Sequence, residues 1–277
     1  SSRTPTPIEL SCNEGVFEIA QSLAIQQGEN GEEVDFECRL PNAFVADPPL
    51  KQVVAKGFEF GFRTIFDLFY MDLSYHRAIN HNDIIFQSTG RSTGLFANVN
   101  QTLREGVDLH LKKELEAVTL DIKYNYLKAV FQDSLKILSA NHPFADPQGQ
   151  ILVSKGKVLP NIPRHQMKFG VHYVMSDRLT VSGNLFYNSE QFLRGDESNQ
   201  ISPLKGYFLV NATAYYIFND RISCFIEGTN LMNNEYENFG LIGEDPRTVI
   251  PSLSRNDPVF LGPGAPRGVW VGLKIEI

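Results

Sequence analysis

The chain has 277 residues, which is long enough for one large domain or two ordinary ones. Its formal net charge of −7 argues against a general nucleic-acid-binding protein, so no nucleic-acid partner is expected. No apolar run approaches the ~20 residues that a membrane-spanning helix needs. The mean hydropathy of −0.19 is typical of a soluble protein, but transmembrane β-barrels share it because their strands alternate apolar and polar residues.

The first segment, SSRTPTPIEL at 1–10, has no initiator Met, no basic stretch and no apolar core of a signal peptide. We therefore expect either a mature chain or a piece of a longer protein. Cys12 and Cys38 follow in a polar segment that is poor in strand patterns. A disulfide that closes this loop is one interpretation and two free thiols are the other. Cys224 falls inside a strand pattern and is most simply a small buried apolar residue.

The dominant period along the chain is two, which predicts β-strands. In the segment 118–126, for example, Val118, Leu120 and Ile122 alternate with polar residues. The same alternation recurs in the segments 106–112, 167–174, 179–187 and 268–277. No long amphipathic helix pattern is present, so the sequence predicts an all-β, antiparallel architecture of about ten strands, from TPTPIEL to Ile277.

Short and long connections alternate along the chain. The short ones lie near 64–67, 112–116, 174–178 and 217–221. The long ones, rich in Pro, Gly, Asn, Asp and Ser, lie near 11–50, 80–100, 133–163, 190–205 and 237–266. A soluble sandwich has no reason to gather its long loops at one end, whereas outer-membrane barrels do so. Two strand patterns also exceed ten residues, and ~9–11 suffice to cross a bilayer.

The two faces of the expected strands differ in chemistry. Aromatic residues cluster near the strand ends, as in an interfacial girdle, although aromatics also favour strands in general. The polar face carries charges that need water, so we expect it to line a lumen. Its charged members are Glu59, Arg63, Asp108, Lys112, Asp121, Lys123, Lys168, Lys274 and Glu276.

Several segments resemble TonB-dependent outer-membrane receptors, and they occur along the chain in the order that these receptors show. TNLMNNEYE at 229–237 is similar to the Asn-Leu-Phe-Asp/Asn-x-x-Tyr element of the family's penultimate strand, with Met232 in place of the usual Phe. LPNIPRHQMKFGVHY at 159–173 resembles an Ile-Pro-Arg-His strand entry, and 264–277 resembles the closing strand, although Ile277 replaces the usual terminal Phe. The region around Cys12 and Cys38 also resembles such receptors.

The resemblance implies an antiparallel transmembrane β-barrel segment. Residues 1–277 would be the C-terminal portion of a 22-stranded barrel, without the plug domain, and the long loops would be extracellular. It further implies the outer membrane of a Gram-negative bacterium, contact with its lipid, and uptake of a scarce, bulky metal chelate such as a ferric siderophore. The energy would come from a TonB-type protein that engages a region missing here, so this chain alone should not perform active transport.

The resemblance places ligand contacts in the loops, where guanidinium and aromatic groups suit an anionic ferric chelate. The candidate residues are Arg91, Phe96, Arg194, Tyr207, Phe239, Arg247 and Arg255. The alternative is that these side chains only solvate or pack the loops. The acidic loop segments GEDP, RGDES and HNDII are expected to be solvated, with a calcium site as the other interpretation.

We expect no catalytic residue, no metal site and no cofactor. Three other functions remain open at this stage. One is a ten-stranded outer-membrane protease, for which His81 and Asp83 are the local candidates. The others are a passive porin and a soluble β-sandwich binding module. A sandwich would press its apolar strand faces together in a sealed core.

Overall fold

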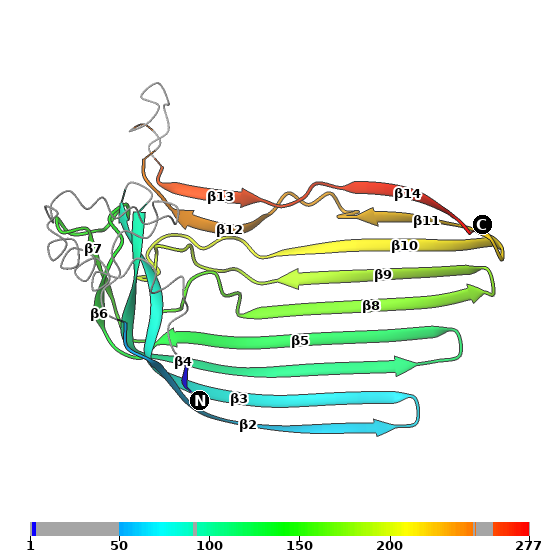
Figure 1. The fold of residues 1–277 in the computed structure, drawn as a ribbon, viewed down its shortest axis with the longest axis horizontal. Helices are drawn as coiled ribbons and strands as arrows, with labels where there is room; N and C mark the ends of the chain where they lie inside the picture. The colour runs from blue at the N-terminus through cyan, green and yellow to red at the C-terminus, as the bar shows by residue number, and fades with distance from the viewer. Residues whose placement is uncertain (1, 4–49, 91–92, 246, 248–256, 277) are drawn as a thin grey trace, which may run out of the picture.

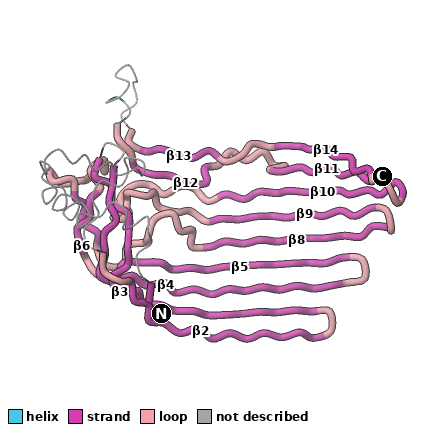
Figure 2. The backbone as a smooth tube through the Cα atoms, viewed as in Figure 1, coloured by secondary structure: helices cyan, strands magenta, loops and turns pink. Residues whose placement is uncertain are grey.

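The computed structural model describes residues 2–3, 50–90, 93–245, 247 and 257–276. Cys12, Cys38, Arg91, Arg255 and the expected strand TPTPIEL lie outside the described residues. The described elements are strands, joined by turns and loops (Figure 2). Within this part of the chain, no helix is long and apolar enough to cross a membrane.

Most of the chain forms one antiparallel sheet of ten strands in the order β1-β2-β3-β4-β5-β8-β9-β10-β11-β14 (Figure 1). The sheet is not closed, since β1 and β14 form its two edges. Its strands are β1 (Ser2–Arg3), β2 (Val53–Phe66), β3 (Phe69–Gly90), β4 (Thr93–Glu114), β5 (Val118–Phe131), β8 (His165–Ser176), β9 (Leu179–Asn188), β10 (Tyr207–Asn219), β11 (Ile222–Thr229) and β14 (Gly268–Ile275).

The register separates the sheet into the two faces that the alternation predicts. Directly opposed residues share a face. One polar row runs across five strands through Arg63, Asp72, His110, Lys123 and Lys168. The next row, on the other face, runs through Phe62, Leu73, Leu109, Tyr124 and Met167.

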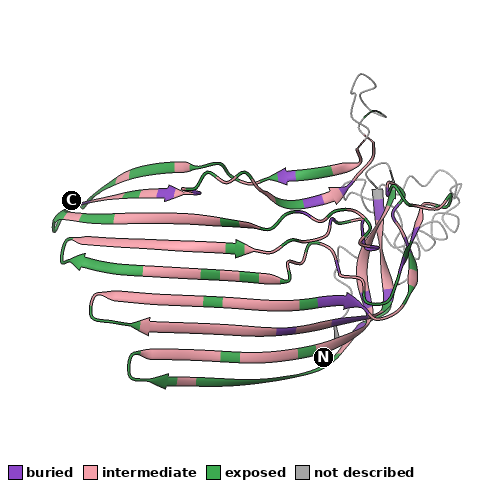
Figure 3. Cartoon of the chain, turned by 180° about the vertical axis from the view of Figure 1, so that it is seen from behind, coloured by how far each residue is buried: buried purple, intermediate pink, exposed green. Residues whose placement is uncertain are grey.

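The apolar face of the sheet is uncovered. Phe60 is 66% exposed, Val271 is 75% exposed and Leu273 is 63% exposed. Most of the buried residues gather instead at one end of the strands, as the view from behind shows (Figure 3). Because the apolar faces are not pressed together, this is not the sealed core of a soluble sandwich. Strands of this length with a bare apolar face suit a hydrocarbon environment.

Short turns and long connections lie at opposite ends of the sheet. Tight turns join β2 to β3, β4 to β5, β8 to β9 and β10 to β11 at the right-hand end of Figure 1, and the longer connections gather at the other end. We call the described long connections and their small hairpins the loop end. Two of these hairpins are β6 (Leu135–Leu138) with β7 (Gln150–Val153), and β12 (Glu237–Ile242) with β13 (Val259–Pro263).

The long connection near 80–100 is an ordered hairpin. β3 and β4 pair through most of it, for example Ile85 with Ala97 and Phe86 with Phe96. Asn82, with a φ of 53°, marks the irregular step between the sheet and this extension. Gly, Ser, Thr and Asn residues give this segment a loop-like composition. The pairing of two such segments across the hairpin, rather than local alternation, makes them strands.

The loop end has a core of its own. A cluster of fully buried side chains, including Phe131, Ile137 and Val153, packs the β6–β7 hairpin onto the ends of β4 and β5. A smaller cluster of Leu193, Leu204 and Ile242 joins the 193–204 loop to β12. Each fully buried large apolar side chain contributes about 1.5–3 kcal/mol. These two clusters hold the loops in place above the sheet.

Candidate functional site

Two hollows are candidates for a functional site. The larger one, about 650 Å³, is a polar groove on the sheet whose lining includes Asp72, Asp108, His110 and Lys123. Most of its charges are matched within the sheet. Asp72 accepts a 2.7 Å hydrogen bond from Nε of Arg63, and a ring nitrogen of His110 lies 2.8 Å from the Asp121 carboxylate. The groove therefore offers little unmatched charge to a small ligand.

The smaller hollow, about 320 Å³, lies at the loop end and is the better candidate. The β3–β4 hairpin extension, the segment after β6, the loop around 194–197 and the end of β12 all contribute to its wall. We call it the Arg194 pocket. Its lining includes Phe86, Arg194, Glu197, Leu241, Ile242 and Glu244.

The backbone of Arg194 is fixed to β12 on both sides. The amide of Arg194 donates to the carbonyl of Gly240 at 3.0 Å, and the amide of Ile242 donates to the carbonyl of Arg194 at 2.8 Å. Gly195 follows with a φ of 96°, a backbone conformation that residues other than glycine rarely adopt. Its carbonyl accepts a 2.7 Å hydrogen bond from Oγ of Ser139. The chain thus turns sharply just after Arg194 has been placed.

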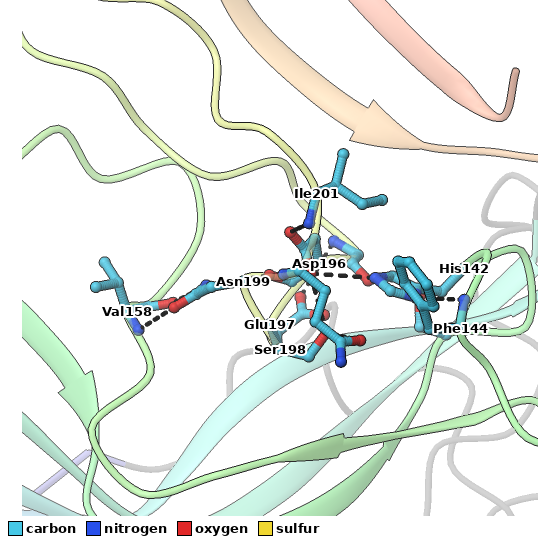
Figure 4. A network of polar contacts seen from close by, with 11 residues as sticks. His142, Phe144, Val158, Asp196, Glu197, Ser198, Asn199 and Ile201 are labelled. Carbon is cyan, nitrogen blue, oxygen red and sulfur yellow. Dashed lines mark hydrogen bonds and ion pairs between the residues drawn. The ribbon is translucent and has the colours of Figure 1, made fainter.

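Asp196 anchors the turn that follows, and its carboxylate is fully buried (Figure 4). One oxygen accepts hydrogen bonds from the Ser198 hydroxyl at 3.0 Å and the Gln200 amide at 2.9 Å. The other accepts from the amide of Ile201 at 2.8 Å. Such bonds satisfy a buried carboxylate that would otherwise be strongly destabilising.

His142 ties this turn to a segment 54 residues away in the sequence. The amide of Phe144 donates to Nδ1 of His142 at 3.1 Å, so in a neutral ring Nε2 carries the proton. That Nε2 lies 3.1 Å from Oδ1 of Asp196 and donates to it. On the other side of the turn, Asn199 bonds both the amide and the carbonyl of Val158, at 2.6 and 3.0 Å. Three separate segments are therefore locked together beside the pocket.

The guanidinium of Arg194 lies over the ring of Phe86, with Cζ 4.2 Å from the ring centroid. Such a stack is a favourable cation–π contact. Among the residues that the structure describes, no carboxylate forms an ion pair with Arg194 within 4 Å. Burial lowers the pKa of Arg194 from its ordinary value, and the nearby Glu197 opposes this effect. Arginine stays protonated in proteins, so the pocket wall carries a fixed positive charge that is exposed to solvent.

Glu197 shares the pocket wall and is only 7% exposed. Burial raises the pKa of its carboxyl from 4.5 to about 7, and the neighbouring Asp196 adds to the rise. A hydrogen bond from the amide of Gly195, at 3.2 Å, and the charge of Arg194 act in the opposite direction. The pocket therefore combines a fixed cation with an acid that changes charge near neutral pH.

Comparison with known proteins identifies the fold. The family model described as TonB dependent receptor-like, beta-barrel matches residues 2–231. This chain belongs to the TonB-dependent receptor family. No curated protein matches the chain. The members of this family are transporters rather than enzymes, in agreement with the expectation that the chain has no catalytic role.

Solved receptors share the fold at low sequence identity. The ferric-catecholate import receptor Fiu from K12 E. coli is 17% identical with a TM-score of 0.55, over 86% of this chain and 30% of that one. The siderophore receptor PiuA from Acinetobacter baumannii is 16% identical with a TM-score of 0.56, over 90% and 31%. The ferric yersiniabactin uptake receptor FyuA from Yersinia pestis is 15% identical with a TM-score of 0.59, over 85% and 32%. The chain spans about a third of these receptors' length.

These findings confirm the resemblance drawn from the sequence motifs. The Asn-rich element at 229–237 does end a receptor strand, since β11 stops at Thr229. Asn230, with a φ of 47°, then turns the chain, and its side-chain amide donates to the carbonyls of Asn234 and Ala265. Asn230 and its hydrogen bonds thus stabilise the turn at the end of β11.

The structure brings two of the predicted ligand residues together and separates the others. Arg194 and Phe96 both contact Phe86, the latter edge-to-face at 5.7 Å between ring centroids. Tyr207 instead packs against Tyr236 at 4.4 Å. Phe239 lies on β12 and is exposed, and Arg247 is paired with Asp245 at 2.6 Å. Their roles in ligand binding stay predictions.

The expectation of solvated acidic loops is wrong for two of the three segments. Asp196 and Glu197 in RGDES are buried, and so is Asp83 in HNDII. Asp83 accepts hydrogen bonds from Thr102 at 2.6 Å and from Arg104 at 2.8 Å, so this protease candidate serves an internal ion pair. Within the part of the chain that the structure describes, no three His, Cys, Asp or Glu side chains form a metal-binding group.

Sequence reasoning missed Glu197, Asp196 and His142. The role of Asp196 could have been predicted, because an Asp whose side chain bonds residues two or more positions later commonly stabilises a local turn. No local signal joins His142 to Asp196, since the two are brought together only by the packing of separate loops.

Proposed function

We propose that this chain forms barrel wall and ligand-capturing loops of an outer-membrane receptor for an anionic metal chelate, most specifically a ferric siderophore. In this proposal the exposed apolar strand faces contact lipid in the outer membrane of a Gram-negative bacterium. The loop end faces the outside, and a TonB-type protein supplies the energy for uptake by the receptor.

One observation carries the proposal: the Arg194 pocket lies at the loop end of a wall that belongs to a receptor family. An exposed guanidinium stacked on an aromatic ring suits the planar, anionic groups of iron chelates. Fiu, PiuA and FyuA are receptors for ferric chelates or siderophores, which supports the same class of ligand for this chain.

The test measures binding by the whole chain reconstituted in lipid bilayers. Radioactive ferric complexes of a catecholate, a hydroxamate and a mixed-type siderophore are titrated in separate arms. We expect one class to bind, and Arg194→Gln to weaken its binding by at least about tenfold, because a charge-assisted contact is lost. Arg178→Gln is the matched control, since that arginine is exposed in the turn between β8 and β9, at the opposite end of the sheet from the pocket. Failure of all three complexes to bind above protein-free bilayers would contradict the proposal.

A further inference from the structure

One cation and two carboxyl groups line the Arg194 pocket, so its net charge depends on how many of the carboxyl groups are ionised. Arg194 presents a solvent-exposed cation with no carboxylate in ion-pair range among the described residues. Two acids, Glu197 and Glu244, line the same cavity. Glu244 is the more exposed of the two, so water screens its charge more effectively. The protonation of Glu197 therefore decides how positive the inside of the pocket is.

The surroundings of Glu197 favour its neutral form. On its own loop it follows Asp196, whose negative charge is held by the Ser198 hydroxyl and backbone amides. From the segment after β6, His142 faces Asp196 rather than Glu197. The other charged groups near it are Arg194 on its own loop and Glu244 at the end of β12, while β3 contributes the uncharged Phe86 and Ser88. A second negative charge beside Asp196 would be poorly solvated.

We propose that the Arg194 pocket binds an anionic group together with one proton. The guanidinium of Arg194 would take the negative charge, and the neutral carboxyl of Glu197 would donate its O–H to the same group. Phe86, Leu241 and Ile242 give the cavity apolar walls, so the anion that fits best is a carboxylate or phenolate on a planar ring. The inference rests on the proposed function in placing this subsite on the path of the receptor's ligand.

A defined pH dependence follows from this arrangement. When Glu197 is ionised it repels the anion and can no longer donate, so binding at alkaline pH must be accompanied by uptake of a proton. The pKa of Glu197 is about 7 in the free protein. The affinity for the anion is therefore nearly constant below this pH, and it falls by up to about tenfold for each pH unit above it.

The experiment uses benzoate as the anionic probe and benzamide as its uncharged counterpart of similar shape. The whole chain in lipid bilayers is titrated with each compound by ligand-observed NMR, between about pH 5.5 and 8.5, where benzoate stays ionised. We expect benzoate to bind with the pH dependence described above, and benzamide to bind more weakly with no such dependence. Four variants then locate the effect.

Glu197→Gln keeps a neutral donor at all pH values, so we expect it to retain the acid-pH affinity for benzoate across the range. Arg194→Gln should lose benzoate binding at every pH. Glu244→Gln should bind benzoate somewhat more tightly with the pH dependence intact. Arg178→Gln, at an exposed turn at the opposite end of the sheet, should match the unmodified chain. Hydrogen exchange of the 193–204 segment checks that each variant keeps its loop in place.

The proposal is wrong if benzoate fails to bind near pH 6, if its affinity is independent of pH, or if Arg194→Gln binds it unchanged. The comparison of benzoate with benzamide on the unmodified chain decides the matter even if a variant loses its fold. The result is separable from the proposed function. Benzoate binding without ferric-chelate binding would overturn the receptor's ligand class alone, and the reverse outcome would overturn the proton-linked pocket alone.

Discussion

The sheet and the loop end invert the usual distribution of side chains. On the sheet, large apolar residues such as Phe60 and Val271 are exposed, whereas at the loop end the carboxylate of Asp196 is fully buried. The difference agrees with the placement proposed above, in which the sheet lies in lipid and the loop end in water. Strands in lipid need no core of their own because hydrocarbon replaces it, but loops in water must build one from clusters such as that of Phe131 and Ile137.

The comparison also separates two kinds of polar group. On the sheet, charged rows such as Arg63 with Asp72 are partly exposed and pair within their own face. At the loop end, buried acids depend on several hydrogen bonds from backbone amides and neighbouring loops. Changes at the loop end should therefore have large local effects that leave the sheet intact.

The largest effect is expected for Asp196→Ala. The substitution leaves His142, Ser198 and two backbone amides without their acceptor in a buried site. Breaking such a network costs about 3–5 kcal/mol. Hydrogen exchange should show loss of protection in the 193–204 segment while β2–β5 remain protected. Asp146→Ala, the same change at a partly exposed turn, should have a clearly smaller effect, and equal effects would remove the distinction between fully buried and partly exposed acids.

The next effect concerns pH and Glu197. Its pKa is raised from 4.5 to about 7 in the folded loop, so the docked loop retains a proton that a released loop loses between these values. The contribution of Glu197 therefore favours the docked loop most below pH 4.5. As the pH rises to 7, the free energy that holds the loop in place falls by about 3 kcal/mol in all. Hydrogen exchange at several pH values, corrected for intrinsic rates, measures this change. Glu197→Gln should abolish the pH dependence, and its persistence would assign it to another group.

A smaller effect is expected when a charge is placed on the outward face. Leu73→Arg puts a guanidinium among apolar neighbours that face hydrocarbon, which should cost about 2 kcal/mol. Ser74→Arg, one residue along, faces the polar side beside Asp108 and should be tolerated. The two variants are compared by their folding yields in lipid bilayers, which are measured as the fraction of protein whose gel mobility changes on heating. Equal yields would mean that the apolar face does not meet lipid.

The smallest effect is expected for Arg247→Gln. This guanidinium is exposed and paired with Asp245, so its loss should change neither loop protection nor benzoate affinity measurably. The adjacent charge of Asp245, whose pKa the Arg247 guanidinium holds below its ordinary value, stays solvated. A measurable loss of benzoate binding would instead place Arg247 at the ligand site.

The sequence by itself determined the class of fold and the orientation of the strands' faces. Alternation in segments such as 118–126 is local, because successive side chains of a strand point to opposite sides whatever they pair with. The motif at 229–237 likewise marks the end of a strand with residues that act on their own neighbourhood, as Asn230 does. Arg194 and Phe96 were reached through the resemblance and the chemistry of their side chains.

Only the tertiary structure decided which loop residues meet. The contacts of His142 with Asp196 and of Phe86 with Arg194 join segments that are far apart in the chain, and no local pattern encodes them. The same packing buries Glu197, although the composition of its loop predicts a solvent-exposed side chain. The physical reason is that burial and pKa depend on what covers a side chain, whereas strand periodicity depends only on the backbone that carries it.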